Sequence, residues 1–407
     1  MQKKLLALSV AGALAAPAAA LAQVEVYGTI HMSLNKMKYG ESSTGLPSVS
    51  KFDVASHASN VGVRARESLG GGLSAWAQVE TNASMERSNN VAHTSNFASR
   101  NSAVGMQGNF GNIFVGQWTT PWADLDALWG IGTVATYGPI TSIIGRRETT
   151  GSAPNPNCAN NFSGNGGVGL PAGVAATQRT CDSVEGAGGV GHAFWRRISN
   201  SVHYQSPVFG GAQVKVAYQT NQDKSTAGAT VTAADPSMWS ASVTWSGMGG
   251  RARIGAAFDA HKDFTTVGET DKGWRVTGGW NFGFVDIGAA YEQMTYKLGG
   301  DWDATQWGLQ AAVPIGQGAI RLGYSKAEKP EIPVVGEIDA GATQYNIGYD
   351  YRFSKRTTVG AGYAHIKNED LAQFTWSGLS SVQDGQSVTP PPGSDVSIFF
   401  ISMIHRF

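Results

Sequence analysis

The sequence predicts an all-β fold, a 16-stranded antiparallel transmembrane β-barrel of the bacterial outer membrane. Three observations predict it. The chain begins with a secretory signal, it ends at Phe407 after a strand-like run from Asp395, and apolar and polar residues alternate in segment after segment from Val24 onward. Alternation with a period of two indicates strands with one apolar and one polar face. A second uninterrupted apolar stretch of about 18 residues is absent from the sequence, so only strands could cross a bilayer.

The first 22 residues are predicted to be a signal peptide. A pair of lysines precedes an apolar run at 5–16, and Ala20-Leu21-Ala22 supplies the small residues at which signal peptidase would cut before Gln23. A membrane anchor is the weaker interpretation, because the stretch is rich in alanine, contains Pro17 and lacks a stop-transfer flank. We therefore expect one mature domain, residues 23–407.

Composition narrows the function classes. Apolar residues make up 42% of the chain, charged residues 15%, and glycine 53 of 407 positions. The apolar content is too low for a helical membrane protein. Without the signal, 28 basic and 30 acidic residues give a net charge of −2, which argues against a nucleic-acid partner. Cys158 and Cys181 fit one disulfide formed in the oxidising periplasm, while two free thiols are less expected in an exported protein and a zinc site would need more ligands.

The clearest alternation runs from Thr343 to Phe353. Tyrosine, isoleucine and phenylalanine occupy every second position there, and polar residues or glycine stand between them. A soluble β-sandwich alternates in the same way, so further observations are needed. The strands number about sixteen, an even count that is typical of outer-membrane barrels.

The connections between the strands alternate short and long, as expected for periplasmic turns and extracellular loops. The short ones are 68–72, 108–111, 206–211, 247–250, 282–283, 314–318 and 354–355. The long ones are 40–52, 84–97, 119–195, 221–236, 262–272, 297–304, 326–341 and 367–394. Aromatic residues recur near strand ends on the apolar faces, where a membrane interface would hold them. They are Tyr204, Tyr218, Trp245, Tyr291, Tyr324, Tyr363 and Phe407.

Catalytic motifs are poorly represented. The chain has no G-x-S-x-G, no H-E-x-x-H, no P-loop and no zinc-type spacing of Cys and His. His31, His203 and His365 are isolated strand histidines, which are more often structural than catalytic. The sequence therefore predicts a protein that is not an enzyme and needs no cofactor.

Several local segments resemble the general diffusion porins of betaproteobacteria. The resemblance rests on 59–80, 99–116 and 199–211, and on the C-terminal His405-Arg406-Phe407. It implies a sixteen-stranded barrel, a homotrimer in contact with outer-membrane lipid and lipopolysaccharide, and passive passage of small hydrophilic solutes and ions. It also implies that the third long extracellular loop folds into the lumen as a constriction.

The longest connection, 119–195, is the third long one, and it carries Asp124 and Asp126. Strand parity places Arg64 and Arg66 on the polar face, and Arg100 matches the family's recurrent arginine at the start of the fourth strand. Opposed rows of carboxylates and guanidinium groups would form a charged eyelet that sets ion preference. The alternative is that these charges only keep the lumen hydrated.

The third connection also departs from the family pattern. Gln117 stands where these porins commonly have a basic residue. A Cys158–Cys181 disulfide would restrain a loop of about two dozen residues by roughly 3 kcal/mol and could hold a lid.

Two sets of residues on or beside this connection keep alternative interpretations. Four arginines bracket the insertion 151–191 and could widen the positive wall or bind lipopolysaccharide phosphate. They are Arg146, Arg147, Arg196 and Arg197. Trp118, Trp122 and Trp129 are expected to pack the loop on the wall, and a sugar-stacking track is the sharper alternative.

The sequence thus predicts an outer-membrane porin for passive diffusion. A substrate-selective channel for a sugar or a carboxylate is the nearest alternative. An occluded structural or adhesive barrel is another, because the last strand carries apolar residues on both faces from Ile398 to Ile401.

Overall fold

The protein is described here from a computed structural model. The structure describes residues 23–83, 85, 97–130, 137–139, 142–144, 194–221, 235–264, 268–297, 300–332, 336–372, 374–376, 382–383, 386–387 and 390–407. Its strands and helices, in chain order, are β1 (Gln23–Tyr39), β2 (Val49–Ser56), β3 (Asn60–Gly70), β4 (Leu73–Asn82), β5 (Ser102–Gly108), β6 (Gly111–Thr119), α2 (Pro121–Asp124), α3 (Asp126–Trp129), β7 (Arg197–Gln205), β8 (Ala212–Gln219), β9 (Ser237–Gly247), the 3-10 turn η5 (Met248–Gly250), β10 (Ala252–Lys262), β11 (Thr270–Asn281), β12 (Asp286–Lys297), β13 (Asp301–Ile315), β14 (Gly318–Ala327), β15 (Glu331–Ile332), β16 (Gly336–Glu337), β17 (Ala342–Arg352), β18 (Thr357–Asn368), β19 (Val382–Gln383), β20 (Gln386–Ser387) and β21 (Val396–Arg406).

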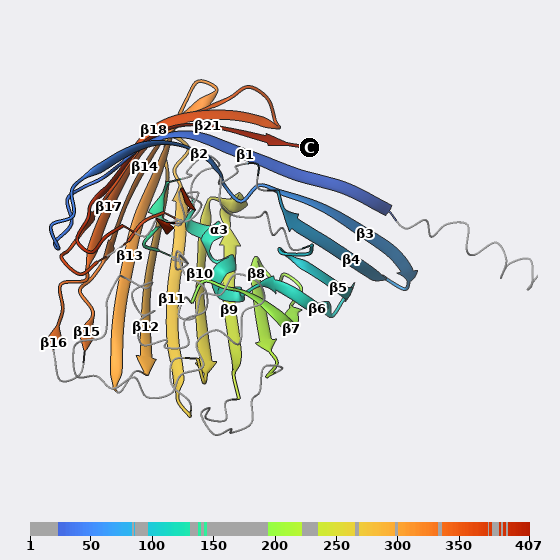
Figure 1. Cartoon of the computed structure of the whole chain (residues 1–407). Coiled ribbons are helices and arrows are strands. Elements are labelled where there is room, and N and C mark those ends of the chain that lie inside the picture. Colours follow the sequence, from blue (N-terminus) through green and yellow to red (C-terminus); the bar gives the residue numbers. More distant parts are fainter. Residues whose placement is uncertain are drawn as a thin grey trace, which may run out of the picture.

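The long strands form one closed antiparallel barrel, which Figure 1 shows from the side. Each strand pairs with its neighbours along the chain, and the last strand, β21, returns to pair with β1 from Thr29↔Arg406 to Tyr39↔Val396. Two backbone hydrogen bonds between Gly28 and Phe407, of 3.2 and 3.1 Å, complete this seam. The predicted 16-stranded fold is confirmed within the described residues, with β2 and β3 counted as one strand.

The second barrel strand is interrupted between β2 and β3. Ala58 has a positive φ of 52°, and the His57 amide donates to the carbonyl oxygen of His31 across the gap at 2.8 Å. The break lets β1 pair with β2 along its second half and with β3 along its first half. A local irregularity of this kind bends a strand and re-aims its side chains.

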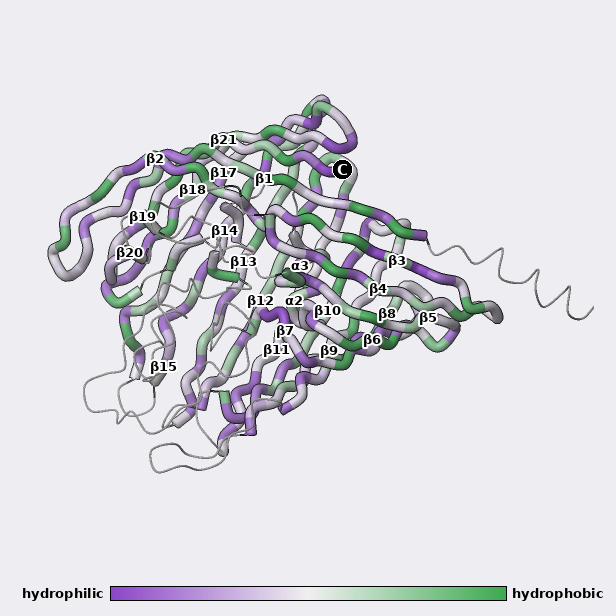
Figure 2. The backbone as a smooth tube through the Cα atoms, turned by 45° about the vertical axis from the view of Figure 1, so that its right-hand side comes forward, coloured by the Kyte–Doolittle hydropathy of each residue, from purple (hydrophilic) through white to green (hydrophobic). Residues whose placement is uncertain are grey.

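Alternation along each strand sets the inner and outer faces, and Figure 2 shows it as alternating colours along the tube. On β17 the apolar residues Tyr345, Ile347 and Tyr349 are exposed, while Gln344 and Asp350 are buried on the opposite face. The polar faces turn to the barrel interior and the apolar faces outward, as the sequence predicted. No helix among the described residues is long and apolar enough to span a bilayer.

The short turns gather at one end of the barrel, and several outer aromatic residues bind them. The Tyr204 hydroxyl donates to the carbonyl oxygen of Phe110 at 2.9 Å, and the Trp245 indole donates to that of Gly210 at 3.1 Å. Such rings combine an apolar body with a satisfied polar edge, which suits a membrane interface.

Candidate functional site: the inner wall of the barrel

The start of the third long connection packs against the inner face of β9–β12. Helix α2 begins after Thr120, whose hydroxyl accepts a hydrogen bond from the Ala123 amide at 3.3 Å, an N-cap with proline at the first helical position. The wall then donates further hydrogen bonds to carbonyl groups of this segment. Arg275 donates to the carbonyl oxygen of Trp122 and Thr277 to that of Leu125, both at 3.2 Å.

Glycines on the wall allow this close approach. A Cβ atom at Gly288 would lie 2.1 Å from the carbonyl oxygen of Trp129, and one at Gly279 would lie 2.9 Å from that of Leu128. Both clashes involve backbone, which cannot move aside without moving α3. Glycine at these two positions therefore lets the backbone of α3 pack directly against the wall.

The two acidic residues predicted for the eyelet pair with bases on the wall behind them. Asp124 binds Lys215 of β8 at 2.6 Å and accepts from the Thr119 hydroxyl at 3.2 Å. Asp126 pairs with Arg275 of β11 and accepts a 2.6 Å hydrogen bond from the Trp195 indole. Arg275 is fully buried and also meets Glu292 at 3.3 Å. Lys215 and Arg275 were not singled out from the sequence.

The basic residues predicted for the eyelet lie on the other side of the barrel, on β3 and at the start of β5. Arg64 pairs with Glu25 of β1 at 2.8 Å, and Arg100 pairs with Glu80 of β4. Arg66 donates to the Ser74 hydroxyl at 3.0 Å.

Parity predicted the inward direction of Arg64 and Arg66, since Val63, the residue before Arg64, is exposed on the apolar outer face. The partners Glu25 and Glu80 could have been found by the same parity, because they stand opposite the inward positions of β3. Contacts among the described residues do not join this basic group to Asp124 or Asp126.

Residues at the junction of the loop and the wall contact polar and aromatic groups of neighbouring strands. Arg197 donates to the Asn101 side-chain oxygen at 2.7 Å. Gln117 donates to the carbonyl oxygen of Arg100 at 3.3 Å. Arg196 is buried and lies over the Phe264 ring, 4.7 Å from its centroid. The remaining predicted residues of this connection, Arg146, Arg147, Cys158 and Cys181, lie outside the described residues.

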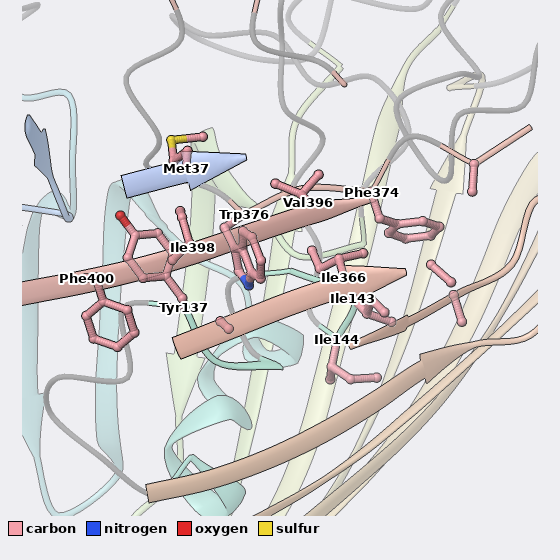
Figure 3. Close-up of a cluster of buried hydrophobic side chains, with 14 of the residues drawn as sticks. Met37, Tyr137, Ile143, Ile144, Ile366, Phe374, Trp376, Val396, Ile398 and Phe400 are labelled. Carbon is pink, nitrogen blue, oxygen red and sulfur yellow. The ribbon is translucent and has the colours of Figure 1, made fainter. Parts of the chain in front are cut away.

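A second part of the connection joins an apolar cluster on the inner face of β1, β18 and β21. Figure 3 shows Tyr137, Ile143 and Ile144 of the connection among inward side chains of those strands. The Tyr137 hydroxyl lies 3.2 Å from that of Ser33, and Gln344 donates to the Tyr137 carbonyl oxygen at 3.0 Å. Burial raises the pKa of the Tyr137 hydroxyl above its usual range, so it stays a hydrogen-bond donor.

This cluster explains why the last strand is apolar on both faces. Ile398 and Phe400 face inward and pack with Tyr137 and Trp376, whereas Phe399 and Ile401 face outward and are each 60% exposed. The inner residues are therefore covered by loops, and the outer ones lie on the apolar face of the barrel.

The three predicted tryptophans have different surroundings. Trp122 and Trp129 are 0% exposed and pack α2 and α3 on the wall, which favours the packing interpretation for both. Trp118 is only half-buried and contacts Phe114 of its own strand β6 and Trp76 of β4, with ring centroids 5.1 and 5.8 Å away.

The histidines of the inner wall contact neighbouring polar and aromatic side chains. His203 stacks on Phe114 with centroids 4.7 Å apart, and His365 Nδ1 lies 2.8 Å from the Ser397 hydroxyl. His31 is buried beside His57.

Solvent exposure divides the inner wall into a covered and an open part. Polar inner residues of β9–β17 are buried under the loops, including Ser240, Arg275, Glu292, Ser325 and Gln344. On β3–β5, by contrast, the inner residues with long side chains stay half-exposed or exposed, including Arg64, Arg66, Trp76, Gln78 and Gln107. We call the inner face of β3–β6 the open wall.

A polar interior inside a closed barrel with an apolar outer face is the arrangement of an outer-membrane channel. A family model described as Gram-negative porin matches residues 7–371. The chain belongs to the Gram-negative porin family. The porin is 26% identical over 413 residues to outer membrane porin protein 32 of Delftia acidovorans, with 96% of this chain and 97% of the relative covered. It is 24% identical over 389 residues to the major outer membrane protein P.IB of Neisseria gonorrhoeae, with 89% and 93% covered.

Solved structures support the fold of the porin. The anion-selective porin from Comamonas acidovorans superimposes with a TM-score of 0.65 at 22% identity, covering 95% of this chain and all of that one. OmpT of Vibrio cholerae, folded in vitro, gives a TM-score of 0.61 at 16% identity, covering 95% and 98%. The porin is thus an outer-membrane protein that forms a diffusion channel.

Proposed function

We propose that the channel conducts small hydrophilic solutes along the open wall and prefers anions. The observation that carries the proposal is the division of the inner wall by exposure. The described loop segments bury the polar residues of β9–β17, while Arg66, Gln78 and their neighbours on the open wall remain accessible. Water and solutes have access to charged groups only where these are uncovered.

Charge on and beside the open wall supports the preference for anions. Among the inner-facing charged residues described on this side, Arg64 is paired with Glu25 and Arg100 with Glu80. Arg66 has only the neutral partner Ser74 among the described residues, whereas Arg197 donates to Asn101 and also interacts with the carboxylate of Glu80. The guanidinium charge of Arg66 is thus left without a carboxylate, and lumen charges of this kind tune the selectivity of barrels.

The acidic residues of the eyelet fit the same proposal. Asp124 and Asp126 are each held by a base, Lys215 and Arg275, on the wall where the loop docks. Their charges are therefore largely compensated locally, and the constriction retains the positive field of the opposite side. The relative from Comamonas acidovorans is itself described as anion-selective. A constriction formed by the third loop, with Arg64, Arg66 and Arg100 on one side and the loop on the other, is part of this proposal.

The assembly of the mature protein is also proposed. We expect cleavage before Gln23, a Cys158–Cys181 disulfide, and a homotrimer embedded in lipid and lipopolysaccharide, without catalytic activity or a cofactor. The broad apolar outer face supports either a lipid contact or a subunit contact at any one position. Cross-linking of the folded protein, followed by electrophoresis without heating, would give a trimer band; a monomer band alone would contradict the trimer.

The reversal potential under a potassium chloride gradient in a planar bilayer tests the function. The expected result is stepwise conductance, with steps in groups of three for a trimer. The sign of the reversal potential should show that chloride is more permeant than potassium. R66Q removes an uncompensated charge and should shift the potential toward zero. N60Q, an uncharged change on the same face, is the control and should leave the potential unchanged.

The other outcomes identify the alternatives. A cation-selective channel would contradict the charge argument. Saturable conductance that a sugar or a carboxylate competes for would identify the substrate-selective channel. No current before or after reduction of the protein would identify an occluded barrel.

A further inference from the structure

An aromatic platform lies on the open wall and the adjoining strand β7, next to the uncompensated Arg66. Four inward residues of β4, β6 and β7 form it: Trp76, Phe114, Trp118 and His203. Phe114 and His203 are buried and stack nearly in parallel, at an interplanar angle of 8°. Trp76 and Trp118 lie over Phe114, with their ring centroids 5.3 and 5.1 Å from it, and both remain half-exposed.

The rings are held in fixed positions. The Trp76 indole donates to the Asn112 side-chain oxygen at 2.8 Å, which sets the plane of its ring. Beneath it, Gly105 leaves room, because a Cβ atom there would lie 2.6 Å from Phe114 Cβ and 2.8 Å from Trp76 Cε2. A pre-positioned ring loses little conformational freedom when a second ring stacks on it.

Polar groups at the platform lack anionic partners. Arg66 stands directly opposite Trp76 in the β3–β4 register, so their Cβ atoms are neighbours on one face. Its guanidinium group is exposed, and its only hydrogen bond among the described residues goes to the neutral Ser74. The indole N–H of Trp118 has no partner among the described residues. A donor pair of this kind, beside flat apolar surfaces, suits a planar ring that carries one carboxylate.

We propose that the open wall binds small aromatic monocarboxylates during permeation, with the ring on Trp76 or Trp118 and the carboxylate on Arg66. The inference rests on the proposed anion-preferring channel and names the solute class that this wall would favour. Aromatic rings prefer offset or edge contacts with each other, which is the geometry already present within the platform. A saturated ring of the same size and charge would keep the contact with Arg66 but lose the ring interaction.

The test compares benzoate with cyclohexanecarboxylate as blockers of the chloride current through the full-length porin in a planar bilayer. Benzoate should block at a concentration roughly two- to tenfold lower, the range expected for one aromatic pair. W76L combined with W118L should abolish this difference, W76L alone should reduce it, and W76F should retain it. R66Q should weaken block by both acids alike. W280L, a change of an outward-facing tryptophan on β11, is the matched control and should behave as the wild type.

The outcomes separate this inference from the proposed function. Equal block by the two acids in a channel that still prefers chloride to potassium would overturn the inference alone. A difference that persists in W76L with W118L combined would also overturn it, because the platform would not be its source. Stronger block by neutral methyl glucoside than by benzoate would assign the platform to sugars instead. Cation preference in the wild type would overturn the proposed function itself. If W76L does not assemble, the comparison of benzoate with cyclohexanecarboxylate in the wild type and in W76F still tests the inference.

Discussion

Replacing Asp126 by asparagine should loosen the attachment of α2 and α3 to the barrel wall. The change keeps the shape of the side chain and removes its charge. Asp126 loses its charge-assisted hydrogen bond to the buried Arg275, while the Trp195 indole can still donate to an amide oxygen. Arg275 keeps Glu292 at 3.3 Å and the carbonyl oxygen of Trp122 at 3.2 Å, so it is not left unpaired. The cost is therefore that of one hydrogen bond between charged groups, about 1.5–3 kcal/mol.

Hydrogen exchange measures this loss directly. The amides of Leu128 and Gly130 donate to the carbonyl oxygens of Leu125 and Asp126, at 3.0 and 2.8 Å, and they exchange only when this segment opens. A loss of about 2 kcal/mol corresponds to roughly thirtyfold faster exchange, since about 1.4 kcal/mol is a factor of ten. Mass spectrometry of a peptide spanning 120–130 would record it, with a peptide from β12 as internal reference.

The matched control is D124N, the same change two residues earlier. Its partner Lys215 is about a fifth exposed, whereas Arg275 is fully buried, so screening by water should make the effect smaller. Exchange in D126N at the wild-type rate, or a larger increase in D124N than in D126N, would refute the assignment of Asp126 as the main attachment point.

Three further changes test the wall and its closure. G288A should displace α3, because the added methyl group would clash with the Trp129 carbonyl oxygen. The amides of the 120–130 peptide should then exchange faster while the barrel stays folded. Unchanged exchange would show that the close contact at Gly288 is not needed to hold α3 on the wall. V276R places a charge on the apolar outer face and should reduce the free energy of unfolding in lipid by about 2–4 kcal/mol. Q78R, on the open wall, should be tolerated. Equal stability of the two variants would contradict the assigned faces. Removal of Phe407 deletes the two backbone bonds to Gly28 at the end of the seam and should lower the fraction that migrates as folded protein without heating. Full folding of this variant would count against the role of these two bonds.

The sequence predicted the faces of the barrel better than the partners within it. Alternation sufficed to place Arg64, Arg66 and Gln344 inward, because side-chain direction in a strand follows from parity alone. It could not predict that Asp126 would meet Arg275, which lies 149 residues away. That pairing depends on which way the connection turns and on glycines that open the wall to it, and neither leaves a periodic signal. Trp76 could have been predicted as an inner-wall residue, since parity places it on the same face as Gln78.

The seam between β1 and β21 has a consequence for how the chain is folded. The first and last strands of the barrel come from opposite ends of the sequence, so their pairing is the most non-local contact that the chain makes. Until it forms, two strand edges display unpaired backbone groups and invite pairing with other chains. Long-range pairing of this kind is slow, because the entropy of closing the whole chain opposes it. A chain of this design must therefore be kept from aggregating until Phe407 has paired with Gly28 at the seam.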